Sequence, residues 1–200
     1  MGRVTCHMSM SLDGFVAGPD QSLEAGLGVG GIELHRWHLP PNPTDPADIA
    51  ATDELLRPMG AYVMGRNMFG PIRGPWTEDW RGWWGDEPPY HAPVFVLTHH
   101  SREPVEMEGG TVFHFVTEGF DAALGRAREV AGEMDVDIAG GASTVRQALA
   151  AGAIEDLYLD VIPVLLGRGE SMFDALPPMS LTQREVSHSP GAIHVHYTVG

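Results

Sequence analysis

The chain carries several short segments whose apolar positions repeat at strand spacing. Residues 4–10 alternate between apolar and polar side chains, which predicts a strand with one buried face. Residues 193–199 alternate in the same way and predict an antiparallel strand near the C-terminus. Three short, mainly apolar segments have the length of buried strands, and they lie at residues 61–64, 93–98 and 136–139.

Apolar residues at helical spacing predict helices between these strands. One helix covers about residues 46–57, another begins at Phe120, and a third follows the strand at 136–139 and ends near Gly152. A strand then follows, and a strand, a helix and a strand joined by tight connections form a parallel crossover unit. The pattern therefore predicts one α/β domain over residues 1–200, with a central mixed sheet and flanking helices.

A pair of glycines, Gly140 and Gly141, separates the last buried strand from the third helix. Two glycines allow a ligand to approach the main chain closely, and the N–H groups at a helix start suit a phosphate. Ser143 or Thr144 is expected to cap the helix. An ordinary strand-to-helix turn explains the same residues, because a glycine pair is a weaker signal than a complete dinucleotide-binding fingerprint.

The three buried strands all end in turns that are suited to ligand binding. These turns are Met64-Gly65-Arg66, Leu97-Thr98-His99 and Ala139-Gly140-Gly141. In open α/β sheets, ligands bind beyond the carboxyl ends of the parallel strands. Arg66, His99 and Arg102 would give this edge positive charge, so we expect a phosphate-bearing dinucleotide to lie there.

Composition and charge narrow the class of protein. Hydrophobic residues make up 43% of 200 residues, which is enough for one ordered globular domain. The formal net charge of -15 argues against a nucleic-acid binder, which needs clustered Lys and Arg. No apolar run approaches the roughly 20 residues of a membrane span, and the N-terminus lacks the pattern of a secretion signal. With Cys6 as the single cysteine, these features predict a cytoplasmic protein without an internal disulfide.

Two stretches, residues 19–42 and 73–92, show no clear periodicity. Loops of this length in a compact domain usually serve a function or move. The second stretch carries four tryptophans that would form a substrate wall or a dimer contact, or would simply pack the loop: Trp76, Trp80, Trp83 and Trp84.

Five segments, taken in order, resemble the dihydrofolate-reductase-like superfamily. They read SLDGFVAG (11–18), MGR (64–66), VFVLT (94–98), IAGG (138–141) and PVLLGRG (163–169). The chain is most similar to the branch typified by the C-terminal reductase domain of the bifunctional riboflavin-biosynthesis deaminase/reductase. We expect a stand-alone form, because no zinc-binding deaminase domain precedes it. The resemblance implies a three-layer domain with a mostly parallel sheet and an antiparallel C-terminal hairpin.

That resemblance also implies an NADPH-dependent reduction. Gly65, Arg66 and Asn67 would meet the cofactor phosphates at a helix start. The pyrophosphate would be cradled by Gly140, Gly141, Ala142, Ser143 and Thr144. The candidates for the adenosine 2′-phosphate are Thr98, His99 and Arg66, and a guanidinium suits a bidentate phosphate contact. The loop from Ser11 to Asp20 would close over the nicotinamide, with Leu12, Asp13, Gly14, Phe15 and Val16 lining that region.

The expected substrate is a small heterocycle, either a pterin or a riboflavin-pathway pyrimidine such as 5-amino-6-(5-phosphoribosylamino)uracil. In dihydrofolate reductases, a carboxylate on the helix after the first loop orients the pterin and helps its protonation. Asp48 and Asp53 lie on that helix here, and together with Asp13 they are the candidate catalytic carboxylates. For the two helix carboxylates, an exposed position on the helix is the simpler explanation. The resemblance also implies a homodimer, to which the Trp-rich loop and the apolar strand from Leu157 to Leu166 would contribute.

Two other classes of protein stay open. A member of the same fold that binds a nucleotide without turnover has the same sequence features. His194 and His196 share one strand face, and four further histidines make a metal protein a third possibility, namely His35, His38, His99 and His100. Solvent-facing side chains explain His194 and His196 more simply, and Cys6 is expected to be inert core.

Overall fold

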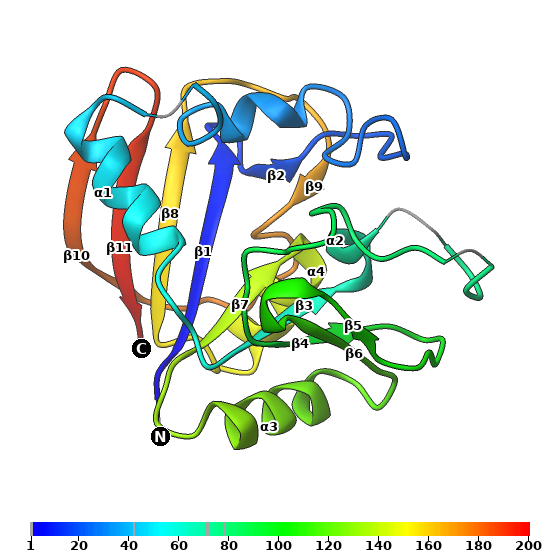
Figure 1. Cartoon of the computed structure of the whole chain (residues 1–200). Helices are drawn as coiled ribbons and strands as arrows, with labels where there is room; N and C mark the ends of the chain where they lie inside the picture. The colour runs from blue at the N-terminus through cyan, green and yellow to red at the C-terminus, as the bar shows by residue number, and fades with distance from the viewer. Residues whose placement is uncertain (1, 42, 71–72, 78) are drawn as a thin grey trace.

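The computed structural model describes residues 2–41, 43–70, 73–77 and 79–200, and Figure 1 shows their arrangement. The residues left out include one in each of the two stretches without periodicity, at positions 42 and 78. A nine-stranded sheet has the order β10-β11-β8-β1-β7-β3-β4-β6-β5, and β2 pairs with β9 in a second, small sheet. The strands are β1 (Val4–Ser11), β2 (Phe15–Ala17), β3 (Ala61–Gly65), β4 (Pro93–Leu97), β5 (Val105–Glu106), β6 (Val112–Val116), β7 (Val136–Gly140), β8 (Asp156–Ile162), β9 (Glu170–Ser171), β10 (Leu181–His188) and β11 (Ile193–Val199). The helices are η1 (Gly31–His35), α1 (Pro46–Leu55), α2 (Arg66–Phe69), η2 (Glu108–Gly110), α3 (Phe120–Ala131) and α4 (Ala142–Ala150).

The central strands of the large sheet run parallel. β8, β1, β7, β3, β4 and β6 pair in parallel, whereas β11 is antiparallel to both β8 and β10. The predicted mixed, mostly parallel sheet with an antiparallel C-terminal hairpin is therefore confirmed. Because β7, β3 and β4 are neighbours, the three turns that follow them meet at one edge of the sheet.

The sheet lies between two unequal layers. One face is apolar and packs against α3 and α4 through a cluster that includes Cys6 on β1, Ile138 on β7 and Val145 on α4. The opposite face is covered at one end by η1 and α1, where Leu34 and Trp37 are buried, and α1 lies in front of the sheet in Figure 1. This arrangement is the three-layer fold that the sequence predicts.

The Trp-rich stretch packs onto the other end of that second face. Trp76, Trp80 and Trp84 pack against a cluster that contains Phe69 and Phe113. Three of the four tryptophans thus serve the interior of this chain. β8, the apolar strand expected to support a dimer, lies between β11 and β1 and is not a sheet edge, so it does not support that expectation.

No helix in the described part of the chain is both long enough and apolar enough to cross a membrane.

Candidate active site

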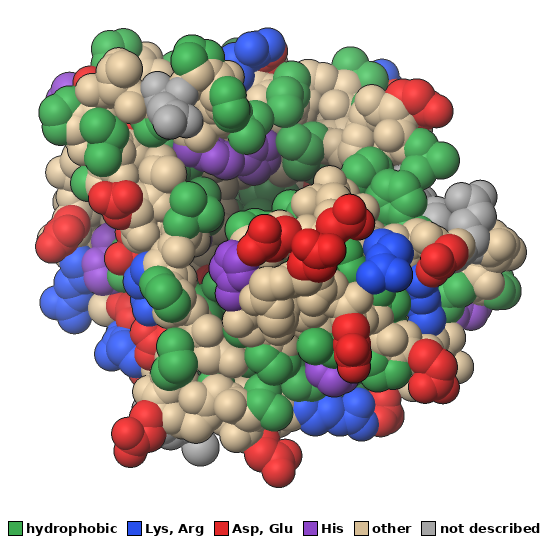
Figure 2. All heavy atoms as spheres, in the orientation of Figure 1, with side chains coloured by type: hydrophobic (Ala, Val, Ile, Leu, Met, Phe, Trp, Pro, Cys, Tyr) green, Lys and Arg blue, Asp and Glu red, His purple; other side chains and the backbone are tan. Residues whose placement is uncertain are grey.

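A cleft of about 1120 Å³ opens where β3, β4 and β7 end. Its walls come from the turns after these strands, from the polar side of β1 and from the long loop before η1. Figure 2 shows this face of the molecule hollowed, with histidine side chains in the hollow. Arg66, Asn67, Thr98 and His99 all line the cleft, as does every residue from Gly140 to Thr144. The structure therefore brings together the three turns that the sequence proposes for a dinucleotide.

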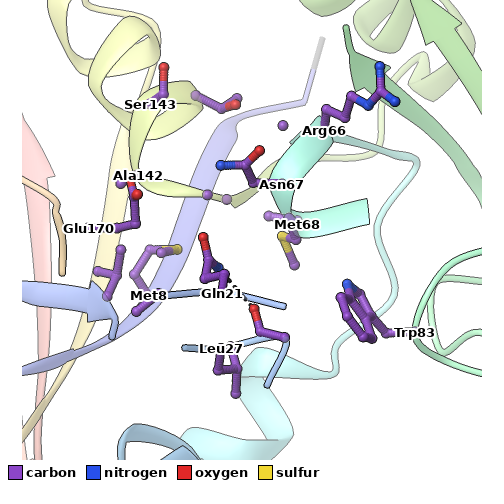
Figure 3. Close-up of a pocket in the computed structure, with 18 of the residues that line it drawn as sticks. Met8, Gln21, Leu27, Arg66, Asn67, Met68, Trp83, Ala142, Ser143 and Glu170 are labelled. Carbon is purple, nitrogen blue, oxygen red and sulfur yellow. Dashed lines mark hydrogen bonds between the residues drawn. The ribbon is translucent and has the colours of Figure 1, made fainter. Parts of the chain in front are cut away.

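The glycine pair forms a bare stretch of main chain in this wall. Gly140 has a φ of 121°, and a Cβ there would lie 3.2 Å from the sulfur of Met68 and 3.3 Å from that of Met8. At Gly141 a Cβ would meet nothing within 4 Å, so the main chain is open toward the cleft. Figure 3 shows Met8 and Met68 beside this turn.

Helix α4 starts directly after the glycine pair. Gly141 is its N-cap residue and no side chain caps it, so the prediction that Ser143 or Thr144 caps the helix is wrong. Both residues lie in its first turn, where Thr144 N–H already donates to Gly141 O at 2.9 Å. The amides of Ala142 and Ser143 precede the first possible intrahelical bond, and an anion in the cleft can accept from them.

Arg66 is the positive group at this end of the cleft. Its guanidinium lies 3.7 Å from the centroid of the Trp76 ring, and its Nη1 donates to Thr98 Oγ1 at 3.4 Å. Its Nε and Nη2 are buried and have no hydrogen-bond partner among the described residues. Burial, together with the nearby charges of Arg73 and Arg102, lowers the pKa of Arg66. Three guanidinium groups thus create a local positive potential in an acidic protein.

Figure 3 shows how two sides of the cleft face each other at the starts of α2 and α4. Arg66 and Asn67 come from the start of α2, and Ala142 and Ser143 come from the start of α4 on the other side. Gly65 joins the two, because a Cβ on it would lie 2.6 Å from Thr144 Oγ1. The close approach of β3 to α4 depends on that missing side chain.

Comparison with known proteins agrees with this geometry. Residues 3–195 match the RibD C-terminal domain. The chain belongs to the RibD C-terminal domain family. No curated protein gives a significant match.

Solved structures of other family members share the fold at low sequence identity. A protein of Shewanella sp. PV-4 assigned to riboflavin biosynthesis is 22% identical, with a TM-score of 0.64, over 100% of this chain and 99% of that one. The diaminohydroxyphosphoribosylaminopyrimidine deaminase/5-amino-6-(5-phosphoribosylamino)uracil reductase of Thermotoga maritima is 14% identical, with a TM-score of 0.57. The alignment covers 100% of this chain and 57% of that longer one.

The dihydrofolate reductase of Enterococcus faecalis, solved with NADP(H), has the same fold. It is 16% identical, with a TM-score of 0.51, over 99% of this chain and 96% of that one. The resemblance to the dihydrofolate-reductase-like superfamily, and to its riboflavin-reductase branch, is thereby confirmed.

Within this family fold, the first loop is tied down rather than inserted into the cleft. Val16 lines the cleft, but Leu12, Asp13, Gly14 and Phe15 do not, and Leu12 is 64% exposed. Asp13 accepts hydrogen bonds from Ser11 Oγ at 2.5 Å, Gly167 N at 2.7 Å and Leu166 N at 3.1 Å. These bonds lower the pKa of Asp13, that from Ser11 most of all. Its carboxylate therefore fastens the loop to residues 166–167 and does not face a substrate.

The two helix carboxylates do not line the cleft either. Asp53 is exposed on α1. Asp48 is buried and lies 2.9 Å from His194 Nε2. The structure therefore places Asp53 outside the candidate site, and any effect of Asp48 on the site would pass through His194.

His194 is buried, so the expectation that it faces solvent is wrong, whereas the side chain of His196 is 22% exposed. His194 is buried between Asp48 and Asp160, and His196 lies 2.9 Å from Asp156 and stacks on Tyr158. In the described residues, no group of three His, Cys, Asp or Glu side chains is arranged to hold a metal ion. Hydrogen-bonded carboxylates account for both histidines. Cys6 is buried in the core, as expected.

Several polar residues of the cleft wall carry no cofactor or substrate assignment from the sequence. His7 and Ser9 on β1, Asp137 on β7, and His35 and His38 at η1 all line it or border it. The available signal was the polar half of the alternation in β1, which is typical of an exposed strand face. Because β1 is paired on both sides and covered by η1, His7 and Ser9 instead face the cleft.

Two of these wall residues have strongly shifted pKa values. Burial raises the pKa of Asp137 to about 6, against the effect of a hydrogen bond from Thr5 Oγ1 at 3.0 Å. Burial and the nearby His38 lower the pKa of His35 to about 4, so its imidazole is neutral at pH 7. This part of the wall therefore presents uncharged hydrogen-bond donors and acceptors beside the carboxylate of Asp137, whose ionised form is destabilised by burial.

The two long loops meet across the cleft. A Cβ on Gly26 would lie 2.9 Å from the Trp83 ring, and Gln21 Nε2 donates to Gly26 O at 2.9 Å. Figure 3 shows Trp83 on one side of the opening, with Gln21 and Leu27 on the other. This contact covers the cleft on its outer side.

Proposed function

We propose that this protein is a cytoplasmic NADPH-dependent reductase that transfers a hydride to a small heterocycle of pyrimidine or pterin type. Membership of the RibD C-terminal domain family supports a reductase. The name of the Thermotoga relative points to an aminouracil substrate, and the Enterococcus relative was solved with NADP(H). The proposal depends on whether the cleft of this chain suits such a cofactor.

The observation that carries the proposal is the pair of buried, unpartnered nitrogens on Arg66. A buried donor without a partner costs free energy, and an anionic ligand that accepts from these nitrogens would remove that cost. The neighbouring Arg73 and Arg102 raise the local positive potential, which favours an anion with more than one charge. The 2′-phosphate that distinguishes NADPH from NADH is such an anion.

The remaining contacts fit the rest of a dinucleotide. The bare main chain at Gly140 and Gly141 and the first amides of α4 would hold the pyrophosphate. Val16 and Ala17 line the part of the cleft beyond Met8, where they would exclude water from the nicotinamide. When bound there, the reduced nicotinamide supplies the hydride.

The experiment that tests this proposal is a pair of titrations, with NADPH and with NADH, on the wild-type protein and on Arg66→Ala. We expect the wild type to prefer NADPH, and Arg66→Ala to lose that preference while its NADH affinity stays the same. Arg81→Ala is a suitable control, because Arg81 is exposed and donates to Glu106 O outside the cleft. Absence of binding of either cofactor to the wild type would overturn the proposal.

Turnover distinguishes a reductase from a member that only binds. NADPH oxidation is measured against a panel of pterins, pyrimidinediones and quinones. Oxidation with any of them supports the reductase. Tight NADPH binding without oxidation across the panel would favour a non-catalytic member of the same fold.

A further inference from the structure

A buried chain of four acidic and imidazole side chains ends at the cleft. Asp48 Oδ1 lies 2.9 Å from His194 Nε2, and His194 Nδ1 lies 2.7 Å from Asp160 Oδ1. Asp160 Oδ2 in turn lies 2.9 Å from His7 Nε2. The side chains of Asp160, His7 and His194 are 2%, 8% and 8% exposed, so the chain is shielded from water. It connects α1, β11, β8 and β1 in space.

The charges along this chain determine which nitrogen of His7 carries the proton. Burial disfavours a charge on His194, but the hydrogen bonds to Asp160 and Asp48 outweigh it and raise the pKa of His194. Burial would also raise the pKa of Asp160, yet the hydrogen bonds from His194 and His7 hold it below its ordinary value. Asp160 is therefore an acceptor toward His7, and His7 Nε2 must be the donor. In neutral His7, the lone pair is then on Nδ1.

His7 Nδ1 is buried, and it has no hydrogen-bond partner among the described residues. The ring lies between Trp37, whose centroid is 6.4 Å away at an interplanar angle of 22°, and Tyr158 at 5.5 Å. These neighbours and Asp160 hold the ring in one orientation, with His7 at the cleft wall. Trp37 is itself fixed, because its Nε1 donates to Ser9 Oγ at 3.0 Å.

We propose that His7 Nδ1 is the hydrogen-bond acceptor for the heterocyclic substrate, and that it recognises a ring N–H or amino group. The proposal rests on the proposed function, since it assigns the second half of the same cleft to the substrate. Aminopyrimidines and pterins both carry such donors next to a flat ring. Asp160, His194 and Asp48 are positioning residues, which fix the tautomer and orientation of His7 and do not touch the substrate. Asp48, expected to orient the substrate directly, acts through three other side chains, His194, Asp160 and His7.

A neighbouring imidazole extends the same compartment. His35 Nε2 is also buried and without a partner in the described chain, while His35 Nδ1 lies 3.2 Å from His38 Nε2. Because His35 is neutral at pH 7, this compartment presents imidazoles and no additional fixed cation beside the acidic chain. That chemistry suits an uncharged heterocycle and does not suit a phosphate.

The first test reads the tautomer directly in the wild-type protein. Long-range ¹⁵N–¹H NMR correlations distinguish a protonated from a bare ring nitrogen in each histidine. We expect neutral His7 to carry its proton on Nε2 with Nδ1 bare, and His194 to keep its second proton to a higher pH than an ordinary imidazole. Addition of 5-aminouracil is expected to shift the His7 Nδ1 resonance. A proton on His7 Nδ1 with Nε2 bare would overturn the assignment.

The second test removes only the proposed contact. In His7→Gln the amide nitrogen can take the place of Nε2 and still donate to Asp160, but nothing replaces Nδ1. We expect this variant to bind 5-aminouracil about ten-fold more weakly than the wild type, with NADPH affinity unchanged. His196→Gln is the matched control, because His196 on β11 forms a comparable pair with Asp156 on β8, the strand that also carries Asp160, and does not line the cleft. It should bind both ligands like the wild type.

The ligand provides a further control. 1,3-Dimethyluracil has the uracil ring without ring N–H donors, and we expect it to bind equally weakly to the wild type and His7→Gln. Equal affinity of the two proteins for 5-aminouracil would overturn the proposal. So would failure of the wild type to bind 5-aminouracil while it binds NADPH. Failure to bind NADPH with the His7 effect intact would instead overturn the proposed function alone.

Discussion

The guanidinium of Arg66 lies over the indole of Trp76, 3.7 Å from the ring centroid. Trp76 is held in turn, because its Nε1 donates to His100 O at 2.9 Å, directly after the Thr98-His99 turn. The aromatic face stabilises the cation and leaves the in-plane N–H groups of Arg66 directed to other partners. The Trp-rich stretch thus helps to build the end of the cleft where we propose that the cofactor phosphate binds.

Replacement of Trp76 tests that role. We expect Trp76→Leu to weaken NADPH binding by about three- to thirty-fold, since a cation–π contact contributes roughly 0.5–2 kcal/mol. Trp76→Phe keeps an aromatic face and should lose less. Fluorescence or calorimetric titration gives both affinities, and NADH is the internal control because it lacks the 2′-phosphate. An equal loss for NADPH and NADH would show that Trp76 supports the fold and not the Arg66 contact.

The contact between Gly65 and Thr144 predicts a compensating pair of substitutions. Gly65 has φ -81° and ψ 156°, which alanine adopts without strain, so the cost of Gly65→Ala comes from the Cβ that would lie 2.6 Å from Thr144 Oγ1. Overpacking of this kind typically costs about 1–3 kcal/mol in the free energy of unfolding. Adding Thr144→Ala removes the clash. The double variant should therefore lose less free energy of unfolding than the sum of the losses in the two single variants. Urea unfolding of all four proteins measures the coupling. Strictly additive effects would contradict the contact.

Much of this fold could be predicted from periodicity, because the elements that decide it are buried on one or two faces. The strands β3 and β4 are continuous apolar runs, β7 is apolar except at Asp137, and α3 keeps its apolar stripe from Phe120 to Ala131. β10 offered no such signal, since every one of its residues is exposed at the edge of the sheet. A strand without a buried face leaves no hydrophobic pattern to detect.

The residues of the candidate site could be predicted from the sequence only where they lie next to the end of a strand. The turns at Gly65, Thr98 and Gly140 could be placed together, because carboxyl ends of neighbouring parallel strands meet at one edge. The chain from Asp48 to His7 contains hydrogen bonds between residues as far as 153 positions apart in the sequence. Nothing in the sequence near Asp48 indicates that its partner is His194, because that pairing depends on how α1 crosses the sheet.

Asp13 offers a test of how the first loop is held. Its carboxylate accepts from the main-chain N–H groups of Leu166 and Gly167. We expect Asp13→Ala to free the loop locally, with faster amide hydrogen exchange at Gly167 and little change in the global free energy of unfolding. Asp20→Ala is the control, because Asp20 is exposed and pairs with Arg168 outside these bonds. Unchanged exchange at Gly167 would contradict the fastening role.

Asp137 predicts an unusual dependence of stability on pH. Its pKa in the folded protein is about 6, against 3.8 for the ordinary carboxyl, because the side chain is buried at the cleft wall. Between pH 4 and 6 the folded state therefore binds more protons at this site than the unfolded state. As pH rises through that window, the ionisation of Asp137 lowers the free energy of unfolding, and the decrease is complete above pH 6. At about 1.4 kcal/mol per pKa unit, the loss is on the order of 3 kcal/mol.

Asp137→Asn isolates this contribution, because its amide oxygen can still accept from Thr5 Oγ1 while the charge is removed. We expect the variant to be more stable than the wild type at pH 8, and the difference to shrink toward zero as pH falls from 6 to below 4. Asp53→Asn, on the exposed side of α1, should show no such pH-dependent difference. Denaturant unfolding at a series of pH values measures all three proteins. A wild type as stable as Asp137→Asn at pH 8 would mean that the Asp137 charge is compensated in the folded state. A carboxylate retained at such a cost, in the wall that carries His7, is expected where a ligand rather than folding requires it.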